Sequence, residues 1–164
     1  MIFNRKAQPP IRTLIGEGTA LRGELRFTEG LRIDGEVFGD VVAAATGRSL
    51  VVISEKARVQ GKVKGGHVII NGSVVGPVEC DGLLELQPKA RIEGDVRVTN
   101  AVVSGEVQGN VEAVEIVALG KTAHVTGDIR YGKMVARGQA TVRGRVAPIA
   151  EPIEPPRIGN REEG

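Results

Sequence analysis

The 164-residue sequence predicts an all-β fold, a single-domain β-solenoid in which short strands wind in stacked triangular coils around a narrow core. Three observations predict it: an internal 33-residue repeat, strict alternation of apolar and polar residues inside each repeat, and a glycine at a fixed place in each. The composition agrees, because only 2% of the residues are aromatic and the apolar residues are mainly Val, Ile, Leu and Ala. A core without large rings must be narrow and regular.

The repeat is clearest in three segments that align with one another without a gap: LVVISEKARVQGKVKG (50–65), LLELQPKARIEGDVRV (83–98) and IVALGKTAHVTGDIRY (116–131). One column of this alignment holds Gly61, Gly94 and Gly127, and a second glycine series, interleaved with the first, holds Gly72, Gly105 and Gly138. Shorter units on both sides extend the β-helix region over residues 13–147. Residues 1–12 and the Pro-rich residues 148–164 are then expected to be disordered tails.

Each repeat unit is expected to form strands of about five or six residues. Inward residues such as Ala90, Ile92 and Val96 alternate with charged residues such as Glu93, as on a half-buried strand. The glycine also takes an inward place, which predicts a corner with a positive φ or a close backbone approach. If the step from Gly61 to Gly72 spans two faces of a triangular coil, each repeat makes two coils and the solenoid has about seven coils.

Two other all-β folds stay open as alternatives. A β-sandwich needs tight hairpin turns, whereas the only Asn-Gly pair, Asn71-Gly72, lies inside the repeat. A left-handed hexapeptide helix keeps a six-residue period, which glycines at positions 61, 72, 94 and 105 do not follow. Both explain the sequence less well than the solenoid.

Composition also bounds the function. The net charge of +2 gives no strong field for capturing nucleic acid, so a nucleic-acid partner is not expected. The single cysteine, Cys80, excludes an intramolecular disulfide and fits a cytoplasmic location. The sequence has no apolar run long enough to span a membrane, and its first residues lack the pattern of a secretory signal.

Few residues suggest chemistry. Gly120-Lys121-Thr122 matches the end of a phosphate-binding loop, but Glu115 stands where the first glycine of that motif belongs and no helix follows. We therefore expect a turn there, with no nucleotide, metal or other cofactor. His67 and His124 fall at outward or turn positions, and Cys80 falls at an inward one, where a buried thiol is expected. The sequence thus favours a protein that is not an enzyme and has no catalytic residue.

Two alternative functions are kept. One is a solenoid acyltransferase that uses His124 as a base at a subunit boundary. The other is a non-polymerising binding module that uses two basic outward columns, Arg58, Arg91 and His124 in one and Lys64, Arg97 and Arg130 in the other. The acidic residues next to these columns favour an ordinary solvated surface of mixed charge.

The two ends of the solenoid suggest assembly. A solenoid without caps exposes strand edges and an open core, and neither tail contains a capping helix. The ends are therefore expected to stack on other copies of the chain. At the start of the sequence, Met1, Ile2 and Phe3 form an apolar tip beside Arg5 and Lys6, a pattern typical of weak membrane anchors that gain strength by avidity on a polymer.

The segments TLIGEGTALRGELRF and GLRIDGEVFGDV, with the A-x-[VI]-x-G-x-[VI] repeats that follow and the proline-rich flanks, resemble the bactofilin family over residues 13–147. The resemblance implies a right-handed triangular β-helix that polymerises without nucleotide into non-polar filaments, head to head and tail to tail. It implies attachment to the inner face of the cytoplasmic membrane, where such filaments position cell-wall synthesis or peptidoglycan-processing proteins and influence cell shape.

The resemblance also implies where copies of the chain meet. Bactofilins often place a phenylalanine at the end contact of the last coil, and the matching residue here is Val142. The expected polymer interface therefore consists of Val142 and Met134 at one end, with Ile149 as a further candidate, and of Leu14 and Leu21 at the other. The start MIFNRK is similar to the membrane-targeting N-termini of some members.

Overall fold

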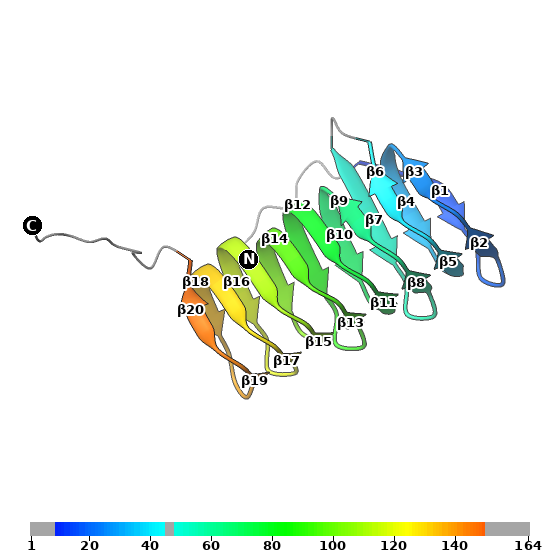
Figure 1. Cartoon of the computed structure of the whole chain (residues 1–164). Coiled ribbons are helices and arrows are strands. Elements are labelled where there is room, and N and C mark those ends of the chain that lie inside the picture. The colour runs from blue at the N-terminus through cyan, green and yellow to red at the C-terminus, as the bar shows by residue number, and fades with distance from the viewer. Residues whose placement is uncertain (1–8, 45–47, 150–164) are drawn as a thin grey trace, which may run out of the picture.

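The computed structural model describes residues 9–44 and 48–149, which form twenty β-strands and no helix. The strands wind into a long three-walled coil, with the first strands at one end of the molecule and the last strands at the other (Figure 1). Every strand pairing is parallel, as a solenoid requires and a hairpin-built sandwich does not allow. The predicted β-solenoid is confirmed.

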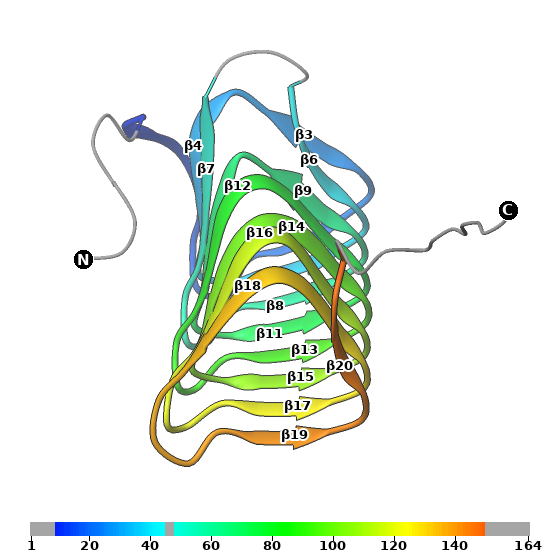
Figure 2. The same cartoon turned by 90° about the vertical axis from the view of Figure 1, so that its left-hand side faces the viewer.

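The view along the axis from the C-terminal end gives the handedness. In Figure 2 the chain crosses the bottom from left to right, rises on the right, passes over the apex and descends on the left while it advances toward the viewer. That sense of rotation is right-handed, which rules out the left-handed hexapeptide helix. We call the three walls the base wall, the ascending wall and the descending wall.

The base wall is an eight-stranded sheet of three-residue strands. Its members in chain order are β2 (Ala20–Arg22), β5 (Glu36–Phe38), β8 (Arg58–Gln60), β11 (Ser73–Val75), β13 (Arg91–Glu93), β15 (Glu106–Gln108), β17 (His124–Thr126) and β19 (Thr141–Arg143). There are thus eight coils, one more than the repeat predicts, because the outermost coils, whose repeats are weakest in the sequence, are complete on this wall.

The other two walls belong to one twelve-stranded sheet. The ascending wall contains β3 (Leu25–Phe27), β6 (Val41–Ala43), β9 (Val63–Gly65) and β20 (Val146–Pro148), and the descending wall contains β1 (Ile11–Ile15), β4 (Glu29–Ile33), β7 (Ser49–Ile53) and β10 (His67–Ile70). Four longer strands bend over the apex and contribute to both walls: β12 (Val78–Leu86), β14 (Val96–Val103), β16 (Val111–Leu119) and β18 (Ile129–Ala136). Strands are therefore mostly shorter or longer than predicted, because the base corners break the chain and the apex does not.

The 33-residue repeat is two coils of unequal length. The corner glycines at positions 61, 76, 94, 109 and 127 follow one another alternately by a shorter and a longer step. The longer coil has an added turn before its base strand, as at Lys121-Thr122. Gly138 does not continue the series of Gly72 and Gly105, because it lies in such a turn with a φ of +66°.

Only glycine fits at the stacked corners, because the main chains of successive coils lie very close together there. A Cβ added to Gly94 would lie 2.3 Å from the main-chain oxygen of Gly76 in the coil below, and the other corners between coils are equally close. Beside this column, polar side chains join successive coils: Asp95 Oδ1 accepts from the N–H of Asn110 at 3.0 Å, and Asn110 Oδ1 accepts from the N–H of Asp128 at 2.9 Å. Inside the coils, inward Val, Ile and Leu side chains form one continuous core.

Candidate assembly site at the coil ends

The first and last coils each have strand edges that pair on one side only. Among the strands that the structure describes, β2 of the base wall pairs only with β5 and β19 pairs only with β17, whereas every base strand between them has two partners. Main-chain N–H and C=O groups of these edges point along the axis and can extend the sheet onto another chain. At the C-terminal end, Pro148 in β20 lacks an N–H, so β19 and the second half of β18 are the edges suited to pairing there.

Three of the four residues predicted for the polymer interface lie at the ends of the core. Leu21 in the first coil and Met134 and Val142 in the last point inward but are only partly buried. In the coils next to them, the same inward columns hold Val37 and Val125, at most 1% exposed. The core therefore ends at each terminus in an apolar surface that the chain itself leaves incompletely covered.

The fourth predicted residue lies elsewhere. Leu14 is 59% exposed and points outward from the descending wall, because Thr13 and Ile15 take the inward places of β1. Ile15 and Leu25 complete the N-terminal end of the core in its place, and sequence reasoning missed both. The alternation in IRTLI was the signal that could have identified Ile15. Ile149, which follows β20, is partly buried and donates its N–H to the oxygen of Tyr131 at 2.6 Å.

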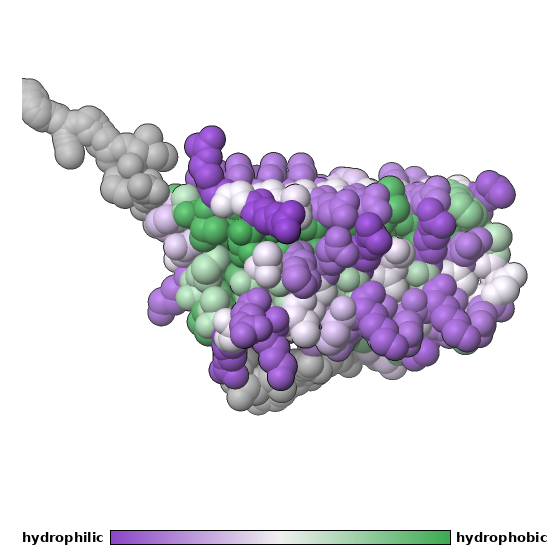
Figure 3. Space-filling model, turned by 90° about the horizontal axis from the view of Figure 1, so that it is seen from below, coloured by the Kyte–Doolittle hydropathy of each residue, from purple (hydrophilic) through white to green (hydrophobic). Residues whose placement is uncertain are grey.

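The C-terminal end is also distinct in surface character. Figure 3 views the molecule from below, onto the base wall, and shows hydrophilic residues over most of this side with hydrophobic residues gathered toward the C-terminal end. Val135 and Val146, both in the outermost strands there, are among the exposed large apolar residues. Exposed apolar residues at one end of a side that is mostly hydrophilic are typical of an interaction surface.

The two histidines are far from one another in the fold. His124 is exposed on β17, with Glu106 and Thr141 as its register neighbours on the base wall. His67 has the predicted outward orientation on β10 but is buried, with Nε2 2.9 Å from Oε2 of Glu85. No group of three or more His, Cys, Asp or Glu residues suited to a metal ion occurs among the residues that the structure describes.

The other residues singled out for chemistry have structural roles. Cys80 is buried, its Sγ donates to the oxygen of Gly66 at 3.2 Å, and burial raises the pKa of the thiol to about 12. A thiol that stays protonated is a poor nucleophile. Gly120 precedes the predicted turn and accepts from the N–H of Ala123 at 3.1 Å, while Thr122 Oγ1 donates to the oxygen of Ser104. This arrangement confirms a turn between coils in place of a phosphate loop.

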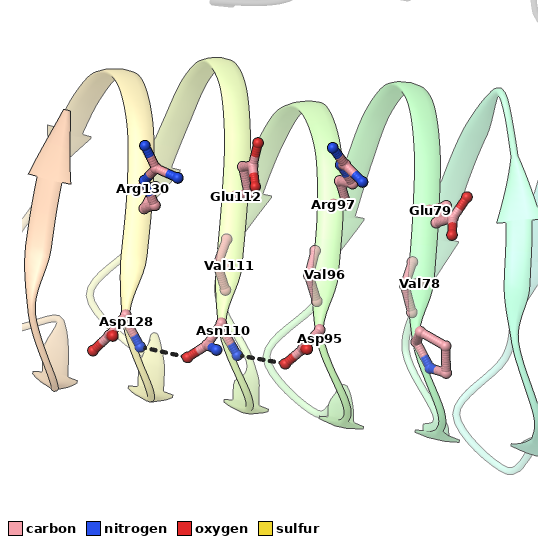
Figure 4. Close-up of a pocket in the computed structure, with 11 residues that line it drawn as sticks. Val78, Glu79, Asp95, Val96, Arg97, Asn110, Val111, Glu112, Asp128 and Arg130 are labelled. Atoms are coloured by element: carbon pink, nitrogen blue, oxygen red, sulfur yellow. Dashed lines mark hydrogen bonds between the residues drawn. The ribbon is translucent and has the colours of Figure 1, made fainter. Parts of the chain in front are cut away.

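The two basic columns do not form basic stripes. Because the repeat spans two coils, sequence comparison aligned only every second member of each column. On the base wall the complete column reads Arg58, Ser73, Arg91, Glu106, His124, and on the ascending wall Lys64, Glu79, Arg97, Glu112, Arg130. Four members of the ascending column line a shallow hollow of about 470 Å³, with Asp95, Asn110 and Asp128 below them (Figure 4): Glu79, Arg97, Glu112 and Arg130. Alternating charge confirms the surface of mixed charge that the acidic neighbours predicted.

The predicted membrane tip, Met1, Ile2, Phe3, Arg5 and Lys6, lies outside the described residues. In the ranges that the structure describes, no helix is long and apolar enough to cross a bilayer.

The fold and its two ends define the class of the protein. It is a right-handed parallel β-helix whose core is open and apolar at both ends, so that both ends are available for stacking. Comparison with sequence families places it more closely. The bactofilin family, described as polymer-forming cytoskeletal, matches residues 13–100 and 84–147. The chain therefore belongs to the bactofilin family of polymer-forming cytoskeletal proteins. Neither the search of characterised proteins nor the search of solved structures gave a match.

Proposed function

We propose that this protein is a nucleotide-independent cytoskeletal scaffold whose filaments grow by end-to-end stacking of the β-helix. The observation that carries the proposal is the partial burial of Leu21, Met134 and Val142 at the two ends of a core that is closed between them. Stacking completes the burial of these side chains and pairs the free edges of β2 and β19. With eight coils at about 4.8 Å per strand, each subunit adds about 38 Å to the filament.

Charge on the end strands supports non-polar filaments. If β19 of one chain paired in parallel with β2 of the next, continuing the register would place Arg143 beside Arg22. Like charges directly opposite one another on a sheet are destabilising. In a two-fold contact between two C-terminal ends, antiparallel β19 strands centred on Val142 instead place each Arg143 opposite Thr141.

The same geometry favours the N-terminal ends meeting one another. Antiparallel β2 strands centred on Leu21 place Arg22 opposite Ala20, so no like charges face each other. Both two-fold contacts also put identical apolar side chains face to face at their centres. We therefore propose filaments that alternate head-to-head and tail-to-tail contacts.

The filaments are proposed to act in the cytoplasm, on the inner face of the cytoplasmic membrane. Support comes from the tip formed by Ile2 and Phe3 next to Arg5 and Lys6. One such tip binds a bilayer weakly, whereas a filament presents many at once. On the membrane the polymer is proposed to position cell-wall synthesis or peptidoglycan-processing proteins. Its role is structural and not enzymatic, because His124 lies on an exposed strand among mixed charges and Cys80 is buried.

Two experiments test the proposal. Electron microscopy and light scattering of purified full-length protein without nucleotide should show filaments, and a species that stays monomeric at all concentrations would contradict assembly. For the membrane, sedimentation with phosphatidylglycerol vesicles should depend on the tip, so deletion of residues 2–6 should abolish it. Undiminished sedimentation of the deletion variant would reject the membrane tip while leaving the polymer intact.

A further inference from the structure

The outer surface of the descending wall differs from that of the other two walls, because its outward side chains are mostly apolar. Alternation with the core places two rows outward, and the register continues each row from coil to coil. The apolar members of these rows from β7 to β16, here called the apolar side surface, are Leu50, Val52, Ile69, Leu83, Val102, Ile116 and Ala118. Outward positions on the base wall carry charged and amide side chains instead, as in β8, β13 and β15.

Two of these outward side chains are nearly as buried as core residues, and the other five are half-buried. Leu50 is 7% exposed and Ala118 9% exposed, whereas the outward Arg91 and Gln108 of the base wall are exposed. In the described part of the chain this wall is a single layer of strands, with no second layer of strands over it (Figure 2). Parallel sheets with apolar side chains on both sides are normally covered on both sides. The apolar side surface is therefore built to receive a covering segment.

Polar groups within this surface indicate which side chains of a covering segment would be complementary to it. Glu85 is 6% exposed and pairs with His67, itself 8% exposed. Asn100 Oδ1 is buried and accepts no hydrogen bond from the residues that the structure describes. A carboxylate accepts several hydrogen bonds, and a buried one is stabilised by a cation. A matching segment combines apolar side chains, a basic side chain and free main-chain donors.

The first described residues, Pro9 and Pro10, lie at the N-terminal edge of the descending wall. The main-chain oxygen of Pro10 lies against Gly30, where an added Cβ would come within 2.3 Å of it, and β1 is the outermost strand of the descending wall. Glu85 in β12 is four strands further along the sheet, about 19 Å away at about 4.8 Å per strand. An extended chain covers that distance in about six residues. An extended chain running back from Pro10 would be long enough to bring Arg5 near the level of Glu85 and the apolar tip near β14 and β16.

We propose that residues 1–8 dock along the apolar side surface, with Ile2 and Phe3 over β14 and β16 and with Arg5 facing Glu85. The docked residues are those proposed to enter the membrane, so docking and membrane insertion exclude each other. That consequence rests on the proposed membrane function, whereas the docking does not. A filament presents many tips to the bilayer together, so assembly shifts the balance from docked to membrane-bound through avidity.

Cross-linking of the full-length protein tests the docking. In a Cys80→Ala background, Ile2→Cys is combined with Val102→Cys, and a short bis-maleimide reagent is added. The expected result is an efficient link within one chain. The matched control combines Ile2→Cys with Val75→Cys, an exposed position on the base wall, and should link poorly. Equal linking of both pairs, absence of a link, or links mainly between differently tagged chains would overturn the proposal, the last by showing a second copy on this surface.

Vesicle binding tests the competition separately. Glu85→Gln removes the charge that faces Arg5, so it should increase sedimentation with phosphatidylglycerol vesicles several-fold, with circular dichroism confirming that the fold is kept. Glu112→Gln on the ascending wall is the matched control and should change nothing. Unchanged or weaker binding of Glu85→Gln would overturn the competition. If deletion of residues 2–6 leaves vesicle binding intact, the membrane function fails, and cross-linking still decides whether the segment docks.

Discussion

A charge at either end of the core should block one kind of end contact and reveal the polarity of the filament. Val142→Arg places a guanidinium at the centre of β19, where Val142 is partly buried and stacks on Val125 of the coil below. In an assembled filament this position would become as buried as Val125, which is 1% exposed. The fold should survive, because in the free chain the new side chain can turn toward solvent at the end of the last coil.

The magnitude follows from the two contributions to the contact. Losing the remaining burial of a valine costs about 1 kcal/mol, and burying an unpaired charge costs several kcal/mol more. A total of about 4 kcal/mol raises the dissociation constant of that contact by about a thousandfold. At concentrations where the natural protein forms filaments, this contact should then be absent.

The species that remain distinguish the two polarities. In a non-polar filament, Val142→Arg leaves the N-terminal contact intact and gives dimers of twice the 17.3 kDa chain mass, and Leu21→Arg gives the converse dimer. In a polar filament every contact needs both ends, so either variant gives monomers. Light scattering with size-exclusion chromatography separates these outcomes, and Gln108→Arg, which adds the same charge to an exposed inner strand, is the control that should still polymerise. Full-length filaments of Val142→Arg would refute the placement of the contact.

Three further predictions concern the coil itself. Gly94→Ala should destabilise the protein by about 3 kcal/mol or more, because its Cβ would meet a main-chain oxygen 2.3 Å away. Gly16→Ala is the control, because an added Cβ there would have nothing within 4 Å, and it should be nearly neutral. Chemical unfolding measures both. Asn110→Ala should lower the free energy of unfolding by about 1 kcal/mol, because it removes a hydrogen-bond acceptor between coils. Asn110→Asp keeps the acceptor and should lower it less. Equal losses in the two variants would reject this role. Cys80 should resist thiol reagents at neutral pH until the chain is unfolded, because burial raises its pKa from 9.0 to about 12. Since the folded value is the higher one, this contribution to the free energy of unfolding is complete below pH 9.0 and is lost as the pH rises toward 12, which denaturant titrations at increasing pH can measure.

The inner side of the coil was predictable and its outer side was not. Alternation and corner glycines are local patterns, so inward residues such as Ile92 and the corner at Gly94 could be identified from their own segments. The order of charges along the outward columns could not be predicted in this way. An offset of 33 residues compares every second coil, and it therefore passes over Glu79 and Glu112. The burial of His67 was missed for a related reason: its partner Glu85 lies 18 residues away in the next coil, diagonally across the strand register.

The apolar side surface did leave a signal in the sequence. In runs such as LVVI (50–53), HVII (67–70) and IVAL (116–119), apolar residues occupy consecutive positions and do not alternate. Such runs are typical of strands covered on both sides. If only every second residue of such a run is assigned to the core, the apolar residues that face outward are left without an explanation.

The sequence by itself determined the parallel solenoid, the inward core and the corner glycines, because each depends on residues close together in the chain. Only the tertiary structure decided which side chains are neighbours along the axis, because that depends on whether a coil is short, as from Gly61 to Gly76, or long, as from Gly76 to Gly94. It placed Leu21, Met134 and Val142 at the open ends of the core and directed Leu14 outward. It also showed that the descending wall is apolar on both sides, since a face exists only once the coils are stacked.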